Sequence, residues 1–266
     1  MPDIQRKLSL EGKNVLVTGA TGYLGRAMVL GLSELGARTF VNGRDHSSVS
    51  RLVDELRAAD LVAEPAVFDI NNEAAVQAWF EEIGDMPLHG LVNNAYAGGA
   101  GSIETSSDTE FRNSYEIALV SANRLLREAL PSLRTAVSET GAASVVNIGS
   151  MYGMVSPDHR IYPGKHAVNP PFYGAAKAAL IQWTRYAACE FGAEGIRVNA
   201  VSPGPFPSSS VQASNPEFVE TLACKVPMGR IGQADELQGP LSFLISDASS
   251  FVNGANLVVD GGWTCW

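Results

Sequence analysis

Two residues four positions apart carry the strongest chemical signal in the sequence. Tyr173 and Lys177 stand at that spacing in Tyr-Gly-Ala-Ala-Lys, so on a helix both side chains project from one face. A phenol has a reference pKa of about 10 and becomes a usable acid/base near neutral pH when an ammonium stabilises its phenolate. Reduction of a carbonyl by hydride needs such a group, because the developing alkoxide must be protonated. The same spacing is common on helix surfaces, so its weight comes from the motifs around it.

A glycine-rich turn near the N-terminus has the form of a phosphate-binding site. It connects a predicted strand, 14–18, to an apolar helix, 26–35. Glycines at such a turn let the backbone approach a pyrophosphate, which the free N–H groups and the helix dipole attract. Without that context, a glycine cluster could be an ordinary tight turn. We expect cofactor contacts from Gly19, Thr21, Gly22, Tyr23, Leu24 and Gly25.

The end of the second predicted strand bears on the choice of cofactor. A carboxylate there would bind a ribose 2′-hydroxyl and repel a 2′-phosphate. Gly43 stands where that carboxylate is expected, and Arg44 follows it with a guanidinium able to bind a phosphate. NADP(H) is therefore favoured. Two alternatives stay open: Arg44 as a solvated turn residue paired with Asp45, or Asp45 binding the ribose of NAD(H).

Short β-branched runs alternate with longer stretches of helical period. This rhythm predicts βαβ units and an α/β fold, a doubly wound parallel sheet of Rossmann type with helices on both faces. We expect a single domain over 1–266. The predicted strands are 14–18, 39–42, 66–69, 90–93, 144–149, 197–201 and 256–259, and the clearest helical segments between them are 48–59, 73–83 and 111–133.

Composition excludes several classes of protein. Of the 266 residues, 28 are acidic and 19 are Lys or Arg, so the net charge of −9 argues against a nucleic-acid partner. The three cysteines are widely spaced, which fits a reducing compartment and predicts neither a disulfide framework nor a metal site. No signal-type or membrane-spanning apolar stretch is present in the sequence. We expect a soluble cytoplasmic protein without a bound metal or a membrane partner.

Taken together, the motifs resemble the short-chain dehydrogenase/reductase family over almost the whole chain and in the family's order. The resemblance is to its compact branch, and to gluconate 5-dehydrogenase-like members within it. The matching pieces are the glycine turn, Asp69, the run Asn93-Asn94-Ala95, Ser150, Tyr173 with Lys177, Pro203-Gly204 and the terminal Val259-Asp260-Gly261-Gly262.

The resemblance implies a role for each matching residue. Tyr173 would be the general acid/base, Lys177 would lower its pKa and hold the nicotinamide ribose, and Ser150 would donate a hydrogen bond to the substrate oxygen. Each motif alone could be an ordinary strand end, helix cap or turn. The remaining cofactor contacts implied are Asp69 and Ile70 at the adenine, Asn93, Asn94 and Ala95 beside the adenine ribose, and Pro203, Gly204, Phe206 and Ser208 at the nicotinamide.

Three departures from the family pattern stand out. The glycine spacing is more typical of the extended branch, which includes nucleotide-sugar epimerases and dehydratases. Tyr96 replaces the glycine that usually completes Asn-Asn-Ala-Gly, which places a phenol near the cofactor or the substrate. Ala118 stands where the family has its proton-relay asparagine, so another group, such as Glu116, Asn113 or a loop residue, would have to hold the lysine-bound water.

An insertion separates the catalytic serine from the tyrosine. Twenty-two residues lie between Ser150 and Tyr173, more than the family usually has. We expect the loop 151–172 to line the substrate mouth, with Tyr96, Tyr152 and Arg160 as substrate contacts, and the segment 205–228 to form a lid. The alternative for the insertion is a solvated loop or a subunit contact.

The sequence thus predicts an NAD(P)-dependent oxidoreductase that interconverts a secondary alcohol and a ketone on a small polar substrate, with a polyol, sugar or sugar acid favoured. Two alternatives remain: a sugar-modifying enzyme of a nucleotide-sugar or polysaccharide pathway, and a cofactor-binding regulator with weak catalysis. By resemblance we expect a homotetramer or homodimer. Two tryptophans in the last four residues, Trp263 and Trp266, favour burial at such an interface.

Overall fold

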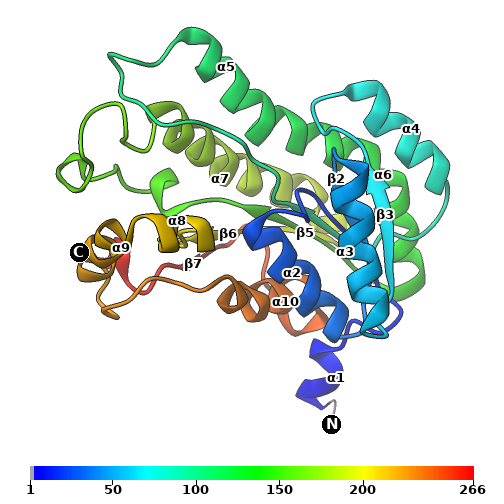
Figure 1. The fold of residues 1–266 in the computed structure, drawn as a ribbon. Helices are drawn as coiled ribbons and strands as arrows, with labels where there is room; N and C mark the ends of the chain where they lie inside the picture. The colour runs from blue at the N-terminus through cyan, green and yellow to red at the C-terminus, as the bar shows by residue number, and fades with distance from the viewer. Residues whose placement is uncertain (1–2) are drawn as a thin grey trace.

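The computed structural model describes residues 3–266, which form one seven-stranded parallel sheet with helices on both sides (Figure 1). The strand order is β3-β2-β1-β4-β5-β6-β7, and every neighbouring pair is parallel. The predicted doubly wound fold is confirmed. The strands are β1 (Asn14–Val17), β2 (Arg38–Gly43), β3 (Ala63–Val67), β4 (Gly90–Asn93), β5 (Ala143–Ile148), β6 (Ile196–Pro203) and β7 (Asn256–Val259).

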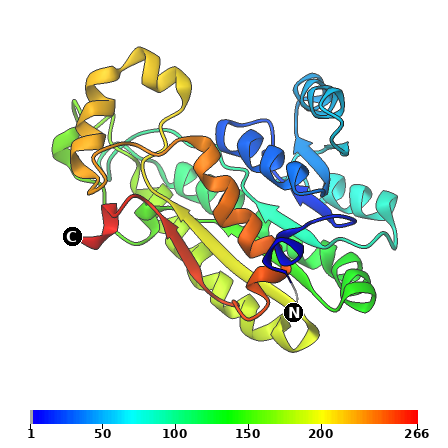
Figure 2. The ribbon, with the colours of Figure 1, turned by 90° about the horizontal axis from the view of Figure 1, so that it is seen from below.

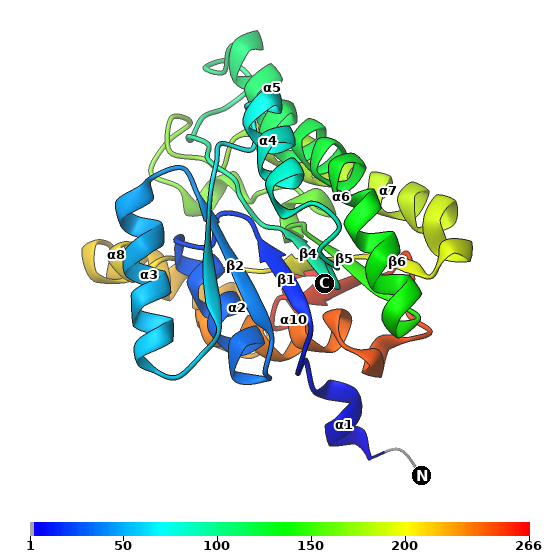
Figure 3. The ribbon, with the colours of Figure 1, turned by 90° about the vertical axis from the view of Figure 1, so that its right-hand side faces the viewer.

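The helices divide between the two faces of the sheet, as Figure 3 shows. On one face, α2 (Tyr23–Glu34), α3 (His46–Ala58) and α10 (Gln238–Ile245) bury one apolar cluster. On the other, α4 (Glu73–Ile83), α6 (Ser121–Thr140) and α7 (Pro171–Phe191) bury a second. Within β1, Val15 and Val17 belong to the first cluster and Leu16 to the second, because successive side chains of a strand point to opposite faces.

The third strand lies earlier than predicted. The sequence placed it at 66–69, but β3 spans Ala63–Val67 and pairs with β2 alone. The observed strand contains Pro65, and a proline removes a ladder hydrogen bond. At the edge of a sheet that loss is tolerated, so the proline marks an edge strand.

The long helix predicted at 111–133 is three elements. The helix α5 (Asp108–Tyr115) begins at a capping box formed by Ser107 and Glu110, and a π-helical turn, η1 (Glu116–Val120), joins it to α6. Such π-bulges often lie at functional sites. This one contains Ala118, the position of the predicted departure from the family.

The loops that follow the strands gather at one end of the sheet, where the chain order reverses between β1 and β4. In such sheets, ligands bind beyond the carboxyl ends of the strands at this point. Figure 2 shows α8 (Ser209–Ser214) and α9 (Pro216–Lys225), in gold, standing beside this end next to the C-terminus. They lie within the predicted lid, 205–228, whose closing remains a prediction.

Only one of the two terminal tryptophans is available to a partner. Trp263 is buried in a cluster with Leu222 and Val226, whereas Trp266 is exposed. The expectation that both are buried at a subunit interface is therefore wrong for Trp263, and the homotetramer stays a prediction. Among residues 3–266, no helix combines the length and the hydropathy that crossing a bilayer requires.

The turn before α2 depends on close backbone packing at Gly25, and this gives a stability test. A Cβ there would lie 2.2 Å from the carbonyl oxygen of Gly19, so backbone would have to move. We expect Gly25→Ala to lower the free energy of unfolding by about 2 kcal/mol. Denaturant unfolding measures this, with Gly99→Ala as control, because no atom lies within 4 Å of a Cβ at Gly99. Equal stability of the two variants would contradict the packing argument.

Candidate active site

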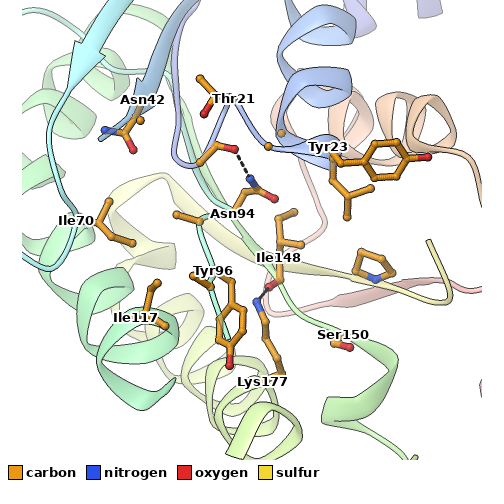
Figure 4. A pocket seen from close by; sticks show the side chains of 18 of the residues that line it. Thr21, Tyr23, Asn42, Ile70, Asn94, Tyr96, Ile117, Ile148, Ser150 and Lys177 are labelled. Atoms are coloured by element: carbon orange, nitrogen blue, oxygen red, sulfur yellow. Dashed lines mark hydrogen bonds between the residues drawn. The ribbon is translucent and has the colours of Figure 1, made fainter. Parts of the chain in front are cut away.

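The glycine turn is fixed to the end of β4 by one amide side chain. Asn94 Nδ2 donates to the carbonyl oxygens of Thr18 at 2.9 Å and Gly19 at 3.1 Å (Figure 4). Gly19 has φ +60, the left-handed region that favours glycine. Asn94 therefore holds the glycine turn against the end of β4, next to the point where the strand order reverses. The helix α2 follows the turn and begins at Tyr23.

The turn opens into a cavity of about 590 Å³ at the carboxyl edge of the sheet. Most of the predicted site residues line it. They are Gly19, Thr21, Gly22, Tyr23, Leu24, Gly25, Arg44, Asp69, Ile70, Asn94, Ala95, Tyr96, Ser150, Tyr173, Lys177, Pro203, Gly204, Phe206 and Ser208. The structure thus brings together residues from seven separate stretches of chain, although it does not by itself assign their roles.

The far end of the cavity meets the start of α3 beside Arg44. An open hollow there is lined by Thr21, Arg44, Asp45 and Ser48. Asp45 caps α3 by accepting from Ser48 N at 3.0 Å, and hydrogen bonds from Ser47 and Ser48 lower its pKa to about 2. Its carboxylate is thus engaged with its own helix. Within residues 3–266 no ion pair joins Asp45 to Arg44.

Gly43 is also closely packed. A Cβ at this position would lie 2.9 Å from Val49 Cγ2. A carboxylate side chain at the end of β2 would therefore require Val49 to move. This close packing agrees with the sequence, which has no ribose-binding carboxylate at the end of β2.

The three predicted catalytic residues converge at the other end of the cavity. Ser150 follows β5, and Tyr173 and Lys177 lie on the first turns of α7, which begins with Pro171 at its first position. The side chains of Tyr173 and Ser150 both line the cavity at this end. Lys177 Nζ donates to the carbonyl oxygen of Ile148 at 2.6 Å, as Figure 4 shows.

Burial shifts the pKa values of both groups on α7. Desolvation raises the pKa of Tyr173, and the nearby Ser150 hydroxyl partly offsets the rise. Desolvation lowers the pKa of Lys177 from 10.5 to about 8. Both shifts favour the uncharged forms, so the predicted lowering of the Tyr173 pKa by Lys177 is not the dominant effect in this state.

Tyr96 lies against the catalytic pair. Its ring meets the ring of Tyr173 edge-on, with centroids 4.9 Å apart. The Tyr96 hydroxyl is 2.8 Å from Ser114 Oγ, which donates to the carbonyl oxygen of Phe172 at 3.0 Å. The expectation of a phenol near the reacting groups agrees with this arrangement.

Asn93 needs a correction. Its side chain does not line the cofactor cavity but is buried in the sheet, where Nδ2 donates to Asn147 Oδ1 at 2.8 Å. Alternation along β4 explains this, since Asn94 takes the side that faces the turn. Asn93 Oδ1 has no hydrogen-bond partner and adjoins a cavity of about 10 Å³ that Ala118 and Lys177 also line.

The groups suggested as substitutes for the relay asparagine lie elsewhere. Glu116 is 2.9 Å from Arg124 Nη2 in an ion pair, and Asn113 is exposed. Neither lines the small cavity beside Lys177.

Arg160 and Tyr152 also need correction as substrate contacts. Arg160 binds Asp158 through Nε and Nη2, both at 2.9 Å, and its side chain is 88% exposed. Tyr152 is buried in the cluster that also contains Leu222 of α9, with its hydroxyl 3.0 Å from that of Tyr162. Neither lines the cavity. The guanidinium of Arg160 is thus paired with Asp158 outside the cavity.

The insertion instead contacts two other segments of the chain, α9 on one side and the loop that carries Glu104 on the other. Lys225 of α9 lies 2.5 Å from Asp158, and the ring of Tyr162 packs on Phe218 of α9. On the other side, Lys165 pairs with Glu104.

Sequence reasoning missed several lining residues. Most are strand-end or backbone neighbours of predicted ones and carry no distinctive side chain. Ile117 comes from the π-helical turn, which no sequence signal revealed. The missed residues are Asn42, Gly43, Phe68, Asn71, Ala97, Ile117, Ile148 and Gly149.

Comparison with known proteins decides the family. The family model described as "Enoyl-(Acyl carrier protein) reductase" matches residues 19–264. The chain belongs to the short-chain dehydrogenase/reductase family. It is therefore an oxidoreductase, as the sequence predicted.

Relatives of this short-chain dehydrogenase/reductase act on different substrates. It is 32% identical to the rhamnolipids biosynthesis 3-oxoacyl-[acyl-carrier-protein] reductase of Pseudomonas aeruginosa, covering 96% of this chain and 97% of the relative. It is also 32% identical to gluconate 5-dehydrogenase of Gluconobacter oxydans, covering 99% and 98%. The solved gluconate 5-dehydrogenase of Burkholderia cenocepacia, in complex with NADP and tartrate, has a TM-score of 0.87 at 27% identity, covering 99% and 100%.

The lowered pKa of Lys177 gives a test that needs no ligand. The unfolded chain binds this proton more tightly than the folded one, so the free energy of unfolding should rise between pH 8 and 10.5, by up to about 3 kcal/mol. Urea unfolding of the wild type and of Lys177→Met across this range isolates the effect, because other titrating groups cancel in the difference. A difference that stays constant with pH would contradict the shift.

Proposed function

We propose that this short-chain dehydrogenase/reductase uses NADP(H) to interconvert a secondary alcohol and a ketone on a small polar substrate, with a polyol, sugar or sugar acid favoured. The observation that carries the proposal is the single cavity that joins the glycine turn and Arg44 at one end to Ser150, Tyr173 and Lys177 at the other.

The residues present fit a dinucleotide. Gly19, Gly22 and Gly25 line the cavity, and glycines at such a turn let backbone amides approach a pyrophosphate. Arg44 would bind the 2′-phosphate, while Asp69 and Ile70 would line the adenine site and Pro203 and Gly204 the nicotinamide site. When bound, NADP(H) supplies or accepts the hydride. The NADP in the B. cenocepacia structure supports this choice.

The protein's own groups manage the proton. Tyr173 gives its hydroxyl proton to the carbonyl oxygen during reduction and takes it back during oxidation. Ser150 donates a hydrogen bond to the same oxygen, where negative charge develops. Lys177 holds the nicotinamide ribose, and its ammonium stabilises the phenolate of Tyr173 once the proton has left.

The substrate class rests on the relatives and on the cavity. The relative from G. oxydans is a gluconate 5-dehydrogenase, and the solved relative binds tartrate, a small polyhydroxy acid. The P. aeruginosa relative reduces 3-oxoacyl groups, so the assay panel needs a 3-oxoacyl thioester beside polyols, sugar acids and their keto forms.

Replacing the acid/base tests the mechanism directly. We expect Tyr173→Phe to lower kcat at least about 100-fold on any substrate of the panel, because the phenylalanine has no proton to transfer. NADPH affinity should stay within about threefold of the wild type, since the ring remains. Nicotinamide absorbance follows turnover, and NADPH fluorescence follows binding.

Tyr186→Phe is the matched control, because Tyr186 lies on the same helix, α7, and its side chain is exposed. It should behave as the wild type. Full activity in Tyr173→Phe would sink the proposed mechanism.

Arg44 should set the cofactor preference. Loss of a charged hydrogen bond to the 2′-phosphate should weaken NADPH binding in Arg44→Ala roughly 10- to 100-fold and leave NADH binding nearly unchanged. Fluorescence titrations with both cofactors measure the ratio. Arg51→Ala, an exposed arginine of α3 outside the cavity, is the control. An unchanged ratio in Arg44→Ala would assign the preference to another residue.

A further inference from the structure

The ammonium of Lys177 is buried with few polar partners. Its exposed fraction is 3%, and the carbonyl oxygen of Ile148 is its one hydrogen-bond acceptor within residues 3–266. In the same described part of the chain, no carboxylate pairs with it. Glu116 of the adjoining η1 is engaged by Arg124. A buried cation without a counter-ion needs another source of electrostatic stabilisation.

Two aromatic rings supply it. Lys177 Nζ lies 5.1 Å from the ring centroid of Tyr96 and 5.8 Å from that of Tyr173. Both distances are within the range in which a ring quadrupole attracts a cation. Tyr96 is the nearer, and Figure 4 shows its ring alongside the Lys177 side chain. Within residues 3–266, the titratable side chains that face Lys177 are these two phenols.

The Tyr96 side chain is itself fixed by a hydrogen bond at its hydroxyl. The Ser114 hydroxyl donates its hydrogen bond to the carbonyl oxygen of Phe172. The Tyr96 hydroxyl is therefore the donor in its hydrogen bond with Ser114 Oγ. Burial raises the pKa of Tyr96, which keeps this donor protonated. Phe172 precedes Tyr173, so this chain of hydrogen bonds connects Tyr96 to the backbone that carries the acid/base.

We propose that Tyr96 is a positioning residue, whose ring stabilises the Lys177 ammonium and holds the Tyr173 ring in place for proton transfer. The proposal rests on the proposed function, in which Tyr173 and Lys177 act on substrate and cofactor. It gives a role to a residue that stands where the family usually has glycine. The glycine could supply neither the ring nor the hydroxyl.

Variants can distinguish the effect of the aromatic ring of Tyr96 from the effects of its hydroxyl and of its side-chain volume. Tyr96→Phe keeps the ring, Ser114→Ala removes the hydroxyl's partner, and Tyr96→Leu and Tyr96→Met keep apolar bulk without a ring. The readouts are kcat and the pH dependence of NADPH affinity between pH 6.5 and 10, the second of which needs no substrate. Circular dichroism confirms that each variant is folded, and either ring-free variant suffices if the other fails.

In the wild type, NADPH affinity should fall about tenfold per pH unit once Lys177 loses its proton. Without the ring, this fall should begin roughly one pH unit lower, because the ammonium is less stabilised. In these variants kcat should fall about tenfold. Tyr96→Phe and Ser114→Ala should keep the wild-type pH dependence and kcat within about threefold.

Two results would overturn the role of Tyr96. One is a ring-free variant with the pH dependence and kcat of the wild type. The other is a shift in Tyr96→Phe as large as in Tyr96→Leu, which would assign the effect to the hydroxyl. The variants Lys177→Met and Tyr173→Phe test the proposed function separately from the role of Tyr96. If the pH dependence persists in Lys177→Met, or turnover persists in Tyr173→Phe, the proposed roles of those residues fail whatever the Tyr96 variants do.

Discussion

The site depends on keeping one ammonium group buried at the carboxyl edge of the sheet. Burial lowers the pKa of Lys177 to about 8, close enough to neutral pH for the charge to be kept and lost within a working range. The surrounding structure limits the free-energy cost of burying this charge. The end of β5 presents the Ile148 carbonyl to Nζ, and α7 places Tyr173 one turn earlier on the same face. The π-helical turn and Tyr96 close the remaining sides with apolar and aromatic groups.

Much of this arrangement could be predicted from the sequence, because it follows from local patterns. Alternating strand and helix signals fix the parallel sheet, and a parallel sheet brings all strand ends to one edge. Residues just after strands, such as Asn94 and Ser150, therefore had to meet. The strand that was misplaced, β3, contains Pro65, whose tolerance at an edge depends on a neighbour that local sequence does not reveal.

What could not be predicted depends on contacts between distant loops. Arg160 attracted attention as a cation near the catalytic serine, yet Asp158, two residues earlier, accepts hydrogen bonds from its Nε and Nη2. Tyr152 turns into the cluster beneath α9, which lies far along the chain. The π-helical turn at Ala118 has no sequence signature. In each case the deciding partner is set by tertiary packing, which residue spacing does not encode.

The basic side chains on and beside the insertion are held in ion pairs outside the cavity. The cations Arg160 and Lys225 share Asp158, and Lys165 pairs with Glu104, so none of the three lines the cavity as an unpaired charge. Among residues 3–266, no guanidinium lines the cavity beside Ser150, and Lys177, which belongs to the catalytic pair, is the one basic side chain at that end. The gluconate 5-dehydrogenase relative takes an acidic substrate, so charge at the mouth is the feature by which a neutral and an acidic member of the proposed substrate class would be distinguished.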